Sequence, residues 1–207
     1  MPAPPARVLE IGCGRLGGFV PDLLRVAGFQ AVGVDPEAPE EPGYSRVEFE
    51  RYEGGERVDA IVACASLHHV VDLGDVLEKA RAMLAPDGAL VIVEWSSERF
   101  DEATARWCFE RLGTPGDEPG WLHRHRAEWQ ASGMSWETFL QNWLEQERLH
   151  DGQEILRELD ARFDLLLLEY GPYYFPDLNG VTEAEEQAAI DAGLIKSSRI
   201  RYVGRPR

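Results

Sequence analysis

A glycine-rich segment near the N-terminus and an acidic residue downstream of it are the first candidates for binding chemistry. Gly12, Gly14 and Gly17 follow a short apolar run, and Asp35 ends the next apolar run. Glycines let the backbone approach a ligand closely, and a carboxylate in this place can bind the two hydroxyls of a ribose. Adenosylmethionine and a nicotinamide dinucleotide both carry an adenosine ribose, so this segment alone fits either ligand.

Two histidines and a glutamate form a second candidate group. His68 and His69 follow a later apolar run, and Glu94 and Trp95 end the run after it. Ligands of open α/β sheets bind at the carboxyl ends of the strands, where these residues would lie. Imidazole suits proton transfer near neutral pH, so His68 and His69 are candidate catalytic bases, and Glu94 is a candidate for orienting an acceptor. The alternative is that these side chains only cap a helix or hydrogen-bond the backbone.

A Trp-rich segment over residues 98–160 is the third candidate. Trp129, Trp136 and Trp143 are spaced by seven residues, but Ser132-Gly133 interrupts the helix between the first two, which argues against a continuous coiled coil. The rings would form either the core of a lid or the wall of a pocket for an aromatic or lipophilic substrate. The candidate substrate-binding residues are Trp95, Trp143, His150, Tyr173 and Tyr174.

Apolar runs that alternate with helical patterns must position these groups. In the first half of the chain this alternation predicts a parallel sheet with crossover helices. The expected strands cover residues 7–11, 31–34, 59–65 and 89–94, with a weaker one at 45–50 and two later ones at 164–170 and 198–204. The expected helices cover residues 18–27, 73–84, 100–112, 135–148 and 151–163, with a further one capped by Thr182.

Five segments, taken together, resemble class I S-adenosylmethionine-dependent methyltransferases, especially the small-molecule group. They are residues 8–14, 32–35, 58–62, 66–70 and 84–94, and the resemblance covers about residues 7–97 well. It implies an α/β fold, a Rossmann-like three-layer sandwich whose mostly parallel seven-stranded sheet has a reversed final strand and a helical lid insertion. We expect a single domain over residues 1–207, divided into a cofactor-binding half (1–97), a helical lid (98–160) and C-terminal strands (161–207).

The same resemblance implies S-adenosyl-L-methionine as the cofactor and assigns residues to it. Glu10 and the loop at Gly12 would hold the methionine end, and Asp35 would bind the ribose. Leu16 stands where many relatives have a third glycine, so the loop is expected to bend at Gly17 or Gly18 instead. The full set of expected cofactor-binding residues is Glu10, Gly12, Cys13, Gly14, Asp35, Pro36, Glu50, Arg51, Tyr52, Cys64 and Ala65.

Methyl transfer to an O, N or C atom of a small-molecule acceptor is the activity that this resemblance implies. The donor is already activated, so the protein chiefly aligns two reactants, and a base is needed only when the acceptor is a hydroxyl or a protonated amine. No His, Cys, Asp or Glu residues have the spacing of a metal site, so metal-independent transfer is expected. An NAD(P)-dependent oxidoreductase and a catalytically inert adenosylmethionine-binding interaction protein are the alternatives.

Composition narrows the partners and the compartment. The 207-residue chain has 21 basic and 37 acidic residues, a formal net charge of −16, and its basic residues are scattered, so we expect no nucleic-acid partner. No apolar run is long enough to predict a membrane span or an export signal. Three cysteines without paired spacing fit a reducing cytoplasm. The first strand is expected almost at Met1, so the lid or a second subunit, as in a homodimer, would close the cofactor site.

Overall fold

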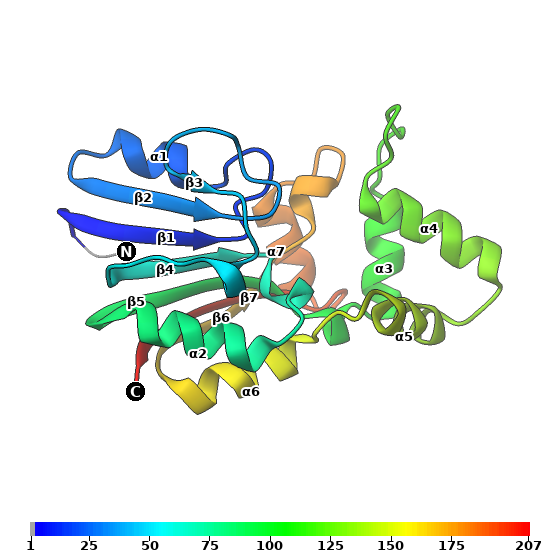
Figure 1. The fold of residues 1–207 in the computed structure, drawn as a ribbon. Helices are drawn as coiled ribbons and strands as arrows, with labels where there is room; N and C mark the ends of the chain where they lie inside the picture. Colours follow the sequence, from blue (N-terminus) through cyan, green and yellow to red (C-terminus); the bar gives the residue numbers. More distant parts are fainter. Residues whose placement is uncertain (1–2) are drawn as a thin grey trace.

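A central β-sheet organises the computed structural model, which describes residues 3–207. Within this range the sheet has seven strands in the order β3-β2-β1-β4-β5-β7-β6 (Figure 1). Strand β7 runs antiparallel to both neighbours and the other pairs are parallel, which confirms the predicted sheet and its reversed final strand. The strands are β1 (Ala6–Ile11), β2 (Phe29–Val34), β3 (Tyr44–Ser45), β4 (Val58–Cys64), β5 (Leu84–Trp95), β6 (Phe163–Gly171) and β7 (Arg199–Pro206).

The weaker strand predicted at 45–50 is mostly wrong. Only Tyr44 and Ser45 pair with β2, and the chain then turns into a short 3-10 helix, η1 (Phe49–Arg51). The period-two pattern did reflect burial, because Val47 is half-buried and Phe49 is buried in the main core. The backbone carbonyl of Glu50 accepts a hydrogen bond from Lys79 Nζ at 2.8 Å, which holds this segment against a neighbouring helix rather than in the sheet.

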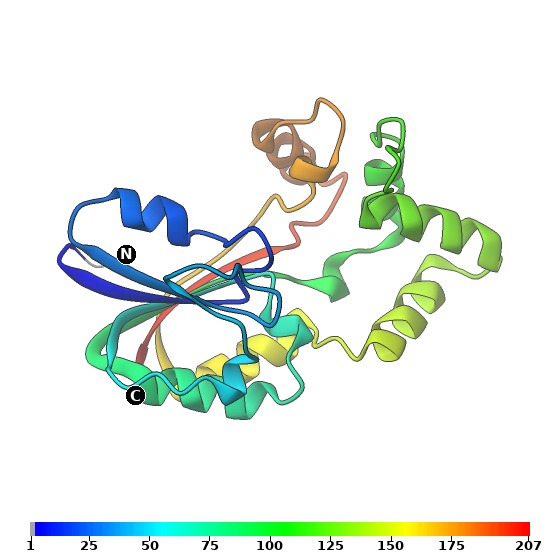
Figure 2. The ribbon, with the colours of Figure 1, turned by 45° about the horizontal axis from the view of Figure 1, so that its top comes forward.

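Helices cover both faces of the sheet. Figure 2 shows α2 (Leu73–Met83) and α6 (Gly152–Arg162) side by side on one face, and α1 (Val20–Arg25) on the other. The main hydrophobic core lies under α2 and α6, where the inward side chains of β4 and β5 meet apolar residues that recur along both helices. Asp72 caps α2 by accepting the Asp75 N–H at 2.9 Å, so the helix begins directly after the loop that follows β4.

Helices α3 (Glu102–Phe109), α4 (Trp121–Ser132) and α5 (Trp136–Glu147) stand beyond one end of the sheet (Figures 1 and 2), and residues 102–147 are called the lid below. They enclose a second hydrophobic core around Phe100 and Trp136. Gly133 ends α4 in the left-handed conformation, with φ of +66°, which confirms the predicted interruption. The predicted lid runs to residue 160, whereas the lid as named here leaves out α6, which packs beside α2.

A buried glutamate fixes the segment between β6 and the last helix, α7 (Glu183–Asp191). Glu186 accepts backbone N–H groups of Tyr173, Tyr174 and Phe175 at 2.7, 2.9 and 2.6 Å. A buried carboxylate without hydrogen bonds would be costly, so Glu186 keeps these three N–H groups close to it. The bonds thereby hold the two tyrosines against the lid core. No helix among residues 3–207 combines the length and the apolar character needed to cross a membrane.

The second core makes a testable contribution to stability. Trp136 is fully buried and its ring N–H donates to the Phe100 carbonyl. We expect Trp136→Ala to lower the free energy of unfolding by about 3–5 kcal/mol, because the change leaves a large cavity. Chemical denaturation measures the effect, and Leu194→Ala, which changes an exposed leucine, is the control. An equal, small effect of both changes would contradict a packed lid core.

Candidate functional site

A first cavity opens at the carboxyl ends of β1, β2 and β4, where ligands of open parallel sheets bind. Its volume is about 720 Å³. The loops that follow these strands and the start of α2 form its walls. The lining residues are Ile11, Gly12, Gly14, Val34, Asp35, Pro36, Glu48, Phe49, Glu50, Arg51, Ala65, Ser66, His69, Val70, Val71, Asp72 and Asp75.

The glycine loop is shaped by close contacts that only glycine allows. Gly12 has φ of +75°, and a Cβ at this position would overlap the Cβ of Ser66, so the loops after β1 and β4 touch. Ser66 Oγ also donates to the Ile11 carbonyl at 3.1 Å. Further on, Gly17 and Gly18 both have positive φ while Leu16 is exposed, which confirms that the loop bends after Leu16.

Asp35 lies at the end of β2 and connects the loop to the cavity. Its Oδ2 accepts the Gly14 N–H at 3.0 Å, and its Oδ1 accepts the Glu37 N–H at 2.6 Å. The carboxylate therefore holds the glycine loop in place while it lines the cavity. This is the position that the sequence predicts for a residue that binds ribose hydroxyls.

Two of the predicted cofactor residues support the loop from behind. Glu10 is buried and accepts the Phe19 N–H at 2.7 Å, and a side chain at Gly18 would overlap its carboxylate. Burial raises the pKa of Glu10. Cys13 is also buried, and burial followed by the charge of Asp35 raises the pKa of its thiol to about 12. Neither side chain is part of the first cavity's lining, and the bonds and contacts of Glu10 hold the glycine loop from behind.

Of the other residues predicted to bind the cofactor, some line the first cavity and some do not. Pro36, Glu50 and Arg51 line it, although the spacing before Glu50 is short. Tyr52 does not, because its ring packs over Gly54 and faces another depression beside β1. The half-buried Cys64 also lies outside the lining. Asp72 and Asp75 also line this cavity and were not predicted, although Asp72 caps the helix that follows the two histidines, which was the available signal.

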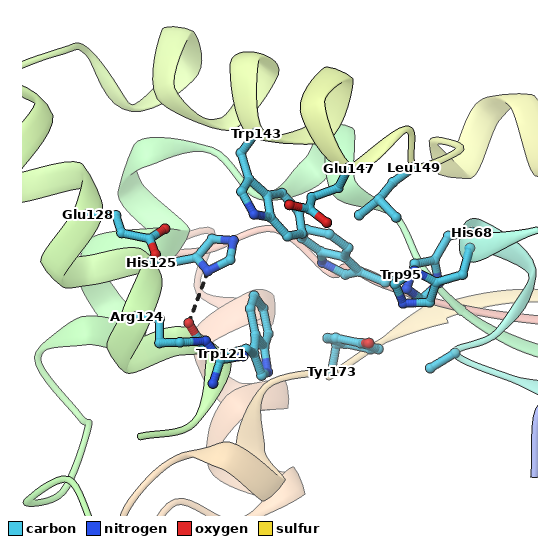
Figure 3. Close-up of a pocket in the computed structure, with 12 residues that line it drawn as sticks. His68, Trp95, Trp121, Arg124, His125, Glu128, Trp143, Glu147, Leu149 and Tyr173 are labelled. Carbon is cyan, nitrogen blue, oxygen red and sulfur yellow. Dashed lines mark hydrogen bonds between the residues drawn. The ribbon is translucent and has the colours of Figure 1, made fainter. Parts of the chain in front are cut away.

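A second cavity, of about 510 Å³, lies between the end of the sheet and the lid (Figure 3). Ala65 and His69 line both cavities, so the two cavities meet at these residues. Ala65 has φ of +48°, which is rare for a residue with a side chain and is held by its N–H bond to the Val93 carbonyl at 2.8 Å. The second cavity is lined by Ala65, His68, His69, Trp95, Trp121, Arg124, His125, Glu128, Trp143, Glu147, Leu149 and Tyr173.

A buried pair, His68 and Glu94, stands at the junction. Glu94 is fully buried, and its Oε1 accepts the N–H groups of Ser66 and Leu67 at 2.7 and 2.6 Å. Its Oε2 lies 2.7 Å from His68 Nδ1. The backbone N–H groups of Ser66, Leu67 and Trp95 can only donate, which favours the ionised form of this carboxyl group. A carboxylate can only accept, so in this form Nδ1 of His68 carries the proton. The free lone pair of His68 is therefore on Nε2.

His69 is the second histidine at the junction. Its ring centroid lies 4.1 Å from that of His68. Partial burial, followed by the proximity of His68, lowers the pKa of His69 below its usual 6.5. The ring is therefore neutral at pH 7 and can accept a proton or a hydrogen bond.

Aromatic rings form much of the second cavity's wall, as predicted for Trp95, Trp143 and Tyr173. Two other predicted substrate residues lie behind the wall. Tyr174 is fully buried, and its hydroxyl accepts the Trp95 Nε1 hydrogen at 3.0 Å. His150 contacts the Val70 carbonyl through Nε2 and Glu154 through Nδ1, both at 3.0 Å, and so ties the start of α6 to the histidine loop. Tyr174 and His150 therefore lie outside the cavity lining and support the residues that form it.

The polar side of the second cavity was not predicted. Trp121, Arg124, His125 and Glu128 follow one another at helical spacing on one face of α4, and Trp143 and Glu147 do the same on α5. This spacing was the available signal, since such residues share a helix face. Among residues 3–207, no group of three or more His, Cys, Asp or Glu side chains is arranged to hold a metal ion.

Comparison with known sequences gives two results. The profile of a family described as Methyltransferase domain matches residues 2–143. The ubiquinone biosynthesis O-methyltransferase of Bradyrhizobium diazoefficiens is 30% identical over 138 residues, which are 59% of this chain and 51% of that protein. The chain thus spans about half the length of this curated relative.

Solved structures share the fold. An S-adenosylmethionine dependent methyltransferase from Mesorhizobium loti matches with a TM-score of 0.56 and 16% identity, over 99% of this chain and 93% of that one. A second match is the 1,6-didemethyltoxoflavin-N1-methyltransferase of Burkholderia thailandensis, which was solved with 1,6-didemethyltoxoflavin and S-adenosylhomocysteine. Its TM-score is 0.53 and its identity 17%, and the match covers 98% of this chain and 72% of that one. At these identities the similarity shows the fold, and it agrees with the predicted Rossmann-like sandwich.

The lowered pKa of His69 can be measured directly. We expect its ring to titrate below pH 6.5 in the folded protein, because burial and His68 disfavour the imidazolium. Below about pH 6.5 the unfolded state then binds more protons at His69 than the folded state does, which lowers the free energy of unfolding. Above that pH His69 is neutral in both states and this loss of stability is absent. Histidine NMR titration, with His69→Gln to assign the signal, is the measurement. A His69 pKa above 6.5 would contradict the structure.

Proposed function

This chain belongs to the methyltransferase-domain family, and we propose that it transfers a methyl group from S-adenosylmethionine to an O, N or C atom of a small-molecule acceptor. The observation that carries the proposal is the meeting of two cavities at Ala65 and His69. One cavity has the features of a nucleoside site and the other is aromatic. Such an arrangement brings two reactants to one junction, which is what a displacement between a donor and an acceptor needs.

The first cavity fits the cofactor by its donors and acceptors. Asp35 offers a carboxylate for the ribose hydroxyls, and the backbone at Gly12 and Gly14 is free of side chains, so a ligand can approach it closely. Glu50 and Arg51 border the far side, where the adenine would lie. When bound, the cofactor supplies an activated methyl group on a sulfonium, so the protein need not activate the donor.

His68 is proposed as the base when the acceptor must lose a proton. The Glu94 carboxylate fixes the Nδ1–H form of its ring, so Nε2 can take a proton from an acceptor in the second cavity. Neutral His69 lies beside it and can accept a hydrogen bond from the same acceptor. Trp95 and the lid helices would exclude water from the junction.

The cellular setting is also proposed. The net charge of −16 supports a function without nucleic acid, because phosphates would be repelled. Cys13, Cys64 and Cys108 are all free thiols, which supports a reducing cytoplasm. We retain the homodimer as a proposal, supported by exposed Leu166 and Leu168 on the edge strand β6, and analytical ultracentrifugation tests it.

Asp35 provides the test of cofactor binding. We expect Asp35→Asn to weaken binding of S-adenosylmethionine about 10- to 100-fold, because the ribose loses hydrogen bonds to a charged acceptor. Isothermal titration measures this, with Asp22→Asn on the exposed surface of α1 as the control. Titration with NAD distinguishes the proposed methyltransferase from the alternative, an NAD(P)-dependent oxidoreductase. Binding of NAD without binding of S-adenosylmethionine would refute the proposed function, and unchanged affinity in Asp35→Asn would refute the ribose assignment.

His68 provides the test of proton transfer. With a hydroxyl or ammonium acceptor, we expect His68→Gln to lower the rate of methyl transfer about 100- to 10,000-fold and to remove its dependence on pH near neutrality. Affinity for S-adenosylhomocysteine should stay unchanged. Transfer of labelled methyl groups to a panel of phenols and amines measures the rate. The control is His123→Gln, whose ring hydrogen-bonds the Gly113 carbonyl in the lid and lines neither cavity. A variant with the wild-type pH profile would exclude His68 as the base.

A further inference from the structure

Four aromatic rings surround the second cavity. The Trp95 ring centroid lies 5.6 Å from that of Trp121, 6.4 Å from that of Trp143 and 6.3 Å from that of Tyr173. Figure 3 shows these rings around an open centre, contributed by β5, α4, α5 and the segment after β6. The faces of aromatic rings carry negative potential, so a group of rings around one space attracts a cation that has an apolar body.

Two carboxylates line the same space. Glu128 comes from α4 and Glu147 from α5, and within the described part of the chain neither forms an ion pair or a side-chain hydrogen bond. Arg124 is the one lysine or arginine in this lining, and its guanidinium donates to the Pro119 carbonyl at 2.6 Å. Burial lowers the pKa values of His69 and His125, so among the groups on the lid side the two carboxylates outnumber the one guanidinium and leave a net negative charge.

His125 adds an unused hydrogen-bond acceptor. Its Nδ1 lies 3.0 Å from the Trp121 carbonyl, which can only accept, so Nδ1 carries the proton and Nε2 carries a lone pair. The side chain is 96% buried, and Nε2 has no partner within residues 3–207. Figure 3 shows this nitrogen on the edge of the ring away from Trp121, toward Trp143. A buried acceptor without a partner is unfavourable. The neighbouring Trp143 ring, whose centroid lies 4.3 Å from that of His125, covers this nitrogen, so a ligand donor reaches Nε2 only when the Trp143 side chain shifts.

From the rings, the carboxylates and His125 together, we propose that the methyl acceptor is a small amine with an apolar or aromatic body, bound as its ammonium ion. An ammonium is the group that satisfies all three features, because it is a cation and carries only donors. A phenol or an alcohol would gain nothing from the two exposed carboxylates, and a ligand with a carboxylate would be repelled by them. This inference rests on the proposed function and identifies the class of acceptor.

The proposed reaction balances in charge and atoms. The bound ammonium gives one proton to His68 Nε2, which leaves a lone pair on the amine nitrogen. That lone pair forms the new N–C bond to the methyl group while the S–C bond breaks, and its electron pair returns to sulfur. The products are the N-methylated ammonium and S-adenosylhomocysteine, and His68 later releases its proton to solvent.

Binding of three probes of similar shape tests the inference. They are phenethylamine, which is a cation, 2-phenylethanol, which is neutral, and 3-phenylpropanoate, which is an anion. We expect phenethylamine to bind the protein saturated with S-adenosylhomocysteine at least about tenfold more tightly than 2-phenylethanol, and 3-phenylpropanoate to bind most weakly. Quenching of tryptophan fluorescence measures binding, since three tryptophans line the cavity.

Paired charge variants locate the effect. We expect Glu128→Gln/Glu147→Gln to weaken phenethylamine binding about tenfold and to leave 2-phenylethanol binding unchanged, because only the cation interacts with the lost charges. The control is Glu137→Gln/Glu145→Gln, which removes the same net charge from α5 residues outside the lining. Equal losses in both double variants would show a long-range charge effect and overturn the assignment to this cavity.

The remaining outcomes separate the two proposals. Isothermal titration with S-adenosylhomocysteine is run on the wild type and on both double variants. A wild type that does not bind S-adenosylhomocysteine refutes the proposed function. A wild type that binds it but prefers 2-phenylethanol or 3-phenylpropanoate, or shows no measurable binding of phenethylamine, overturns the amine inference and leaves the proposed function standing.

Discussion

Glu94 is fully buried at the end of β5, where a carboxylate must find donors to offset the loss of water. It finds them in the loop after β4, through the N–H groups of Ser66 and Leu67 and the ring of His68. The same bonds hold that loop across the ends of two strands and decide which nitrogen of His68 is free. They also fix Ala65 next to both cavities. The junction of the site is therefore built around one desolvated charge, and the lid only completes it.

Much of the sheet was readable from sequence because its strands are short apolar runs bounded by turn residues. Asp35 and Glu94 were expected at the ends of apolar runs, and they do lie at the carboxyl ends of β2 and β5, the edge where ligands of parallel sheets bind. The segment after Ser45 was not readable, because alternating burial arises in a turn that packs under a helix as well as in a strand. The reversed final strand came from the family resemblance and not from any local pattern.

Side-chain direction is what the sequence could not supply at the site. Tyr52, His150 and Tyr174 occupy the expected regions, but each ring points into packing or toward a backbone carbonyl. That choice depends on neighbours far away in the chain. Conversely, the sequence around Glu128 and Glu147 is that of ordinary exposed helix residues. Only the packing of α4 against α5 shows that both line one cavity.

The molecule has two hydrophobic cores, one under α2 and α6 and one around Trp136 in the lid. Trp95 ends a strand of the sheet yet packs in the lid core, so it is a point of contact between them. Half of the residues that line the second cavity belong to the lid, whereas the first cavity is lined by strand ends, the loops after them and the start of α2, with no lid residue. With the second cavity as the proposed acceptor site, exchange of residues on α4 and α5 would alter acceptor preference through evolution or protein engineering and leave the proposed donor site intact.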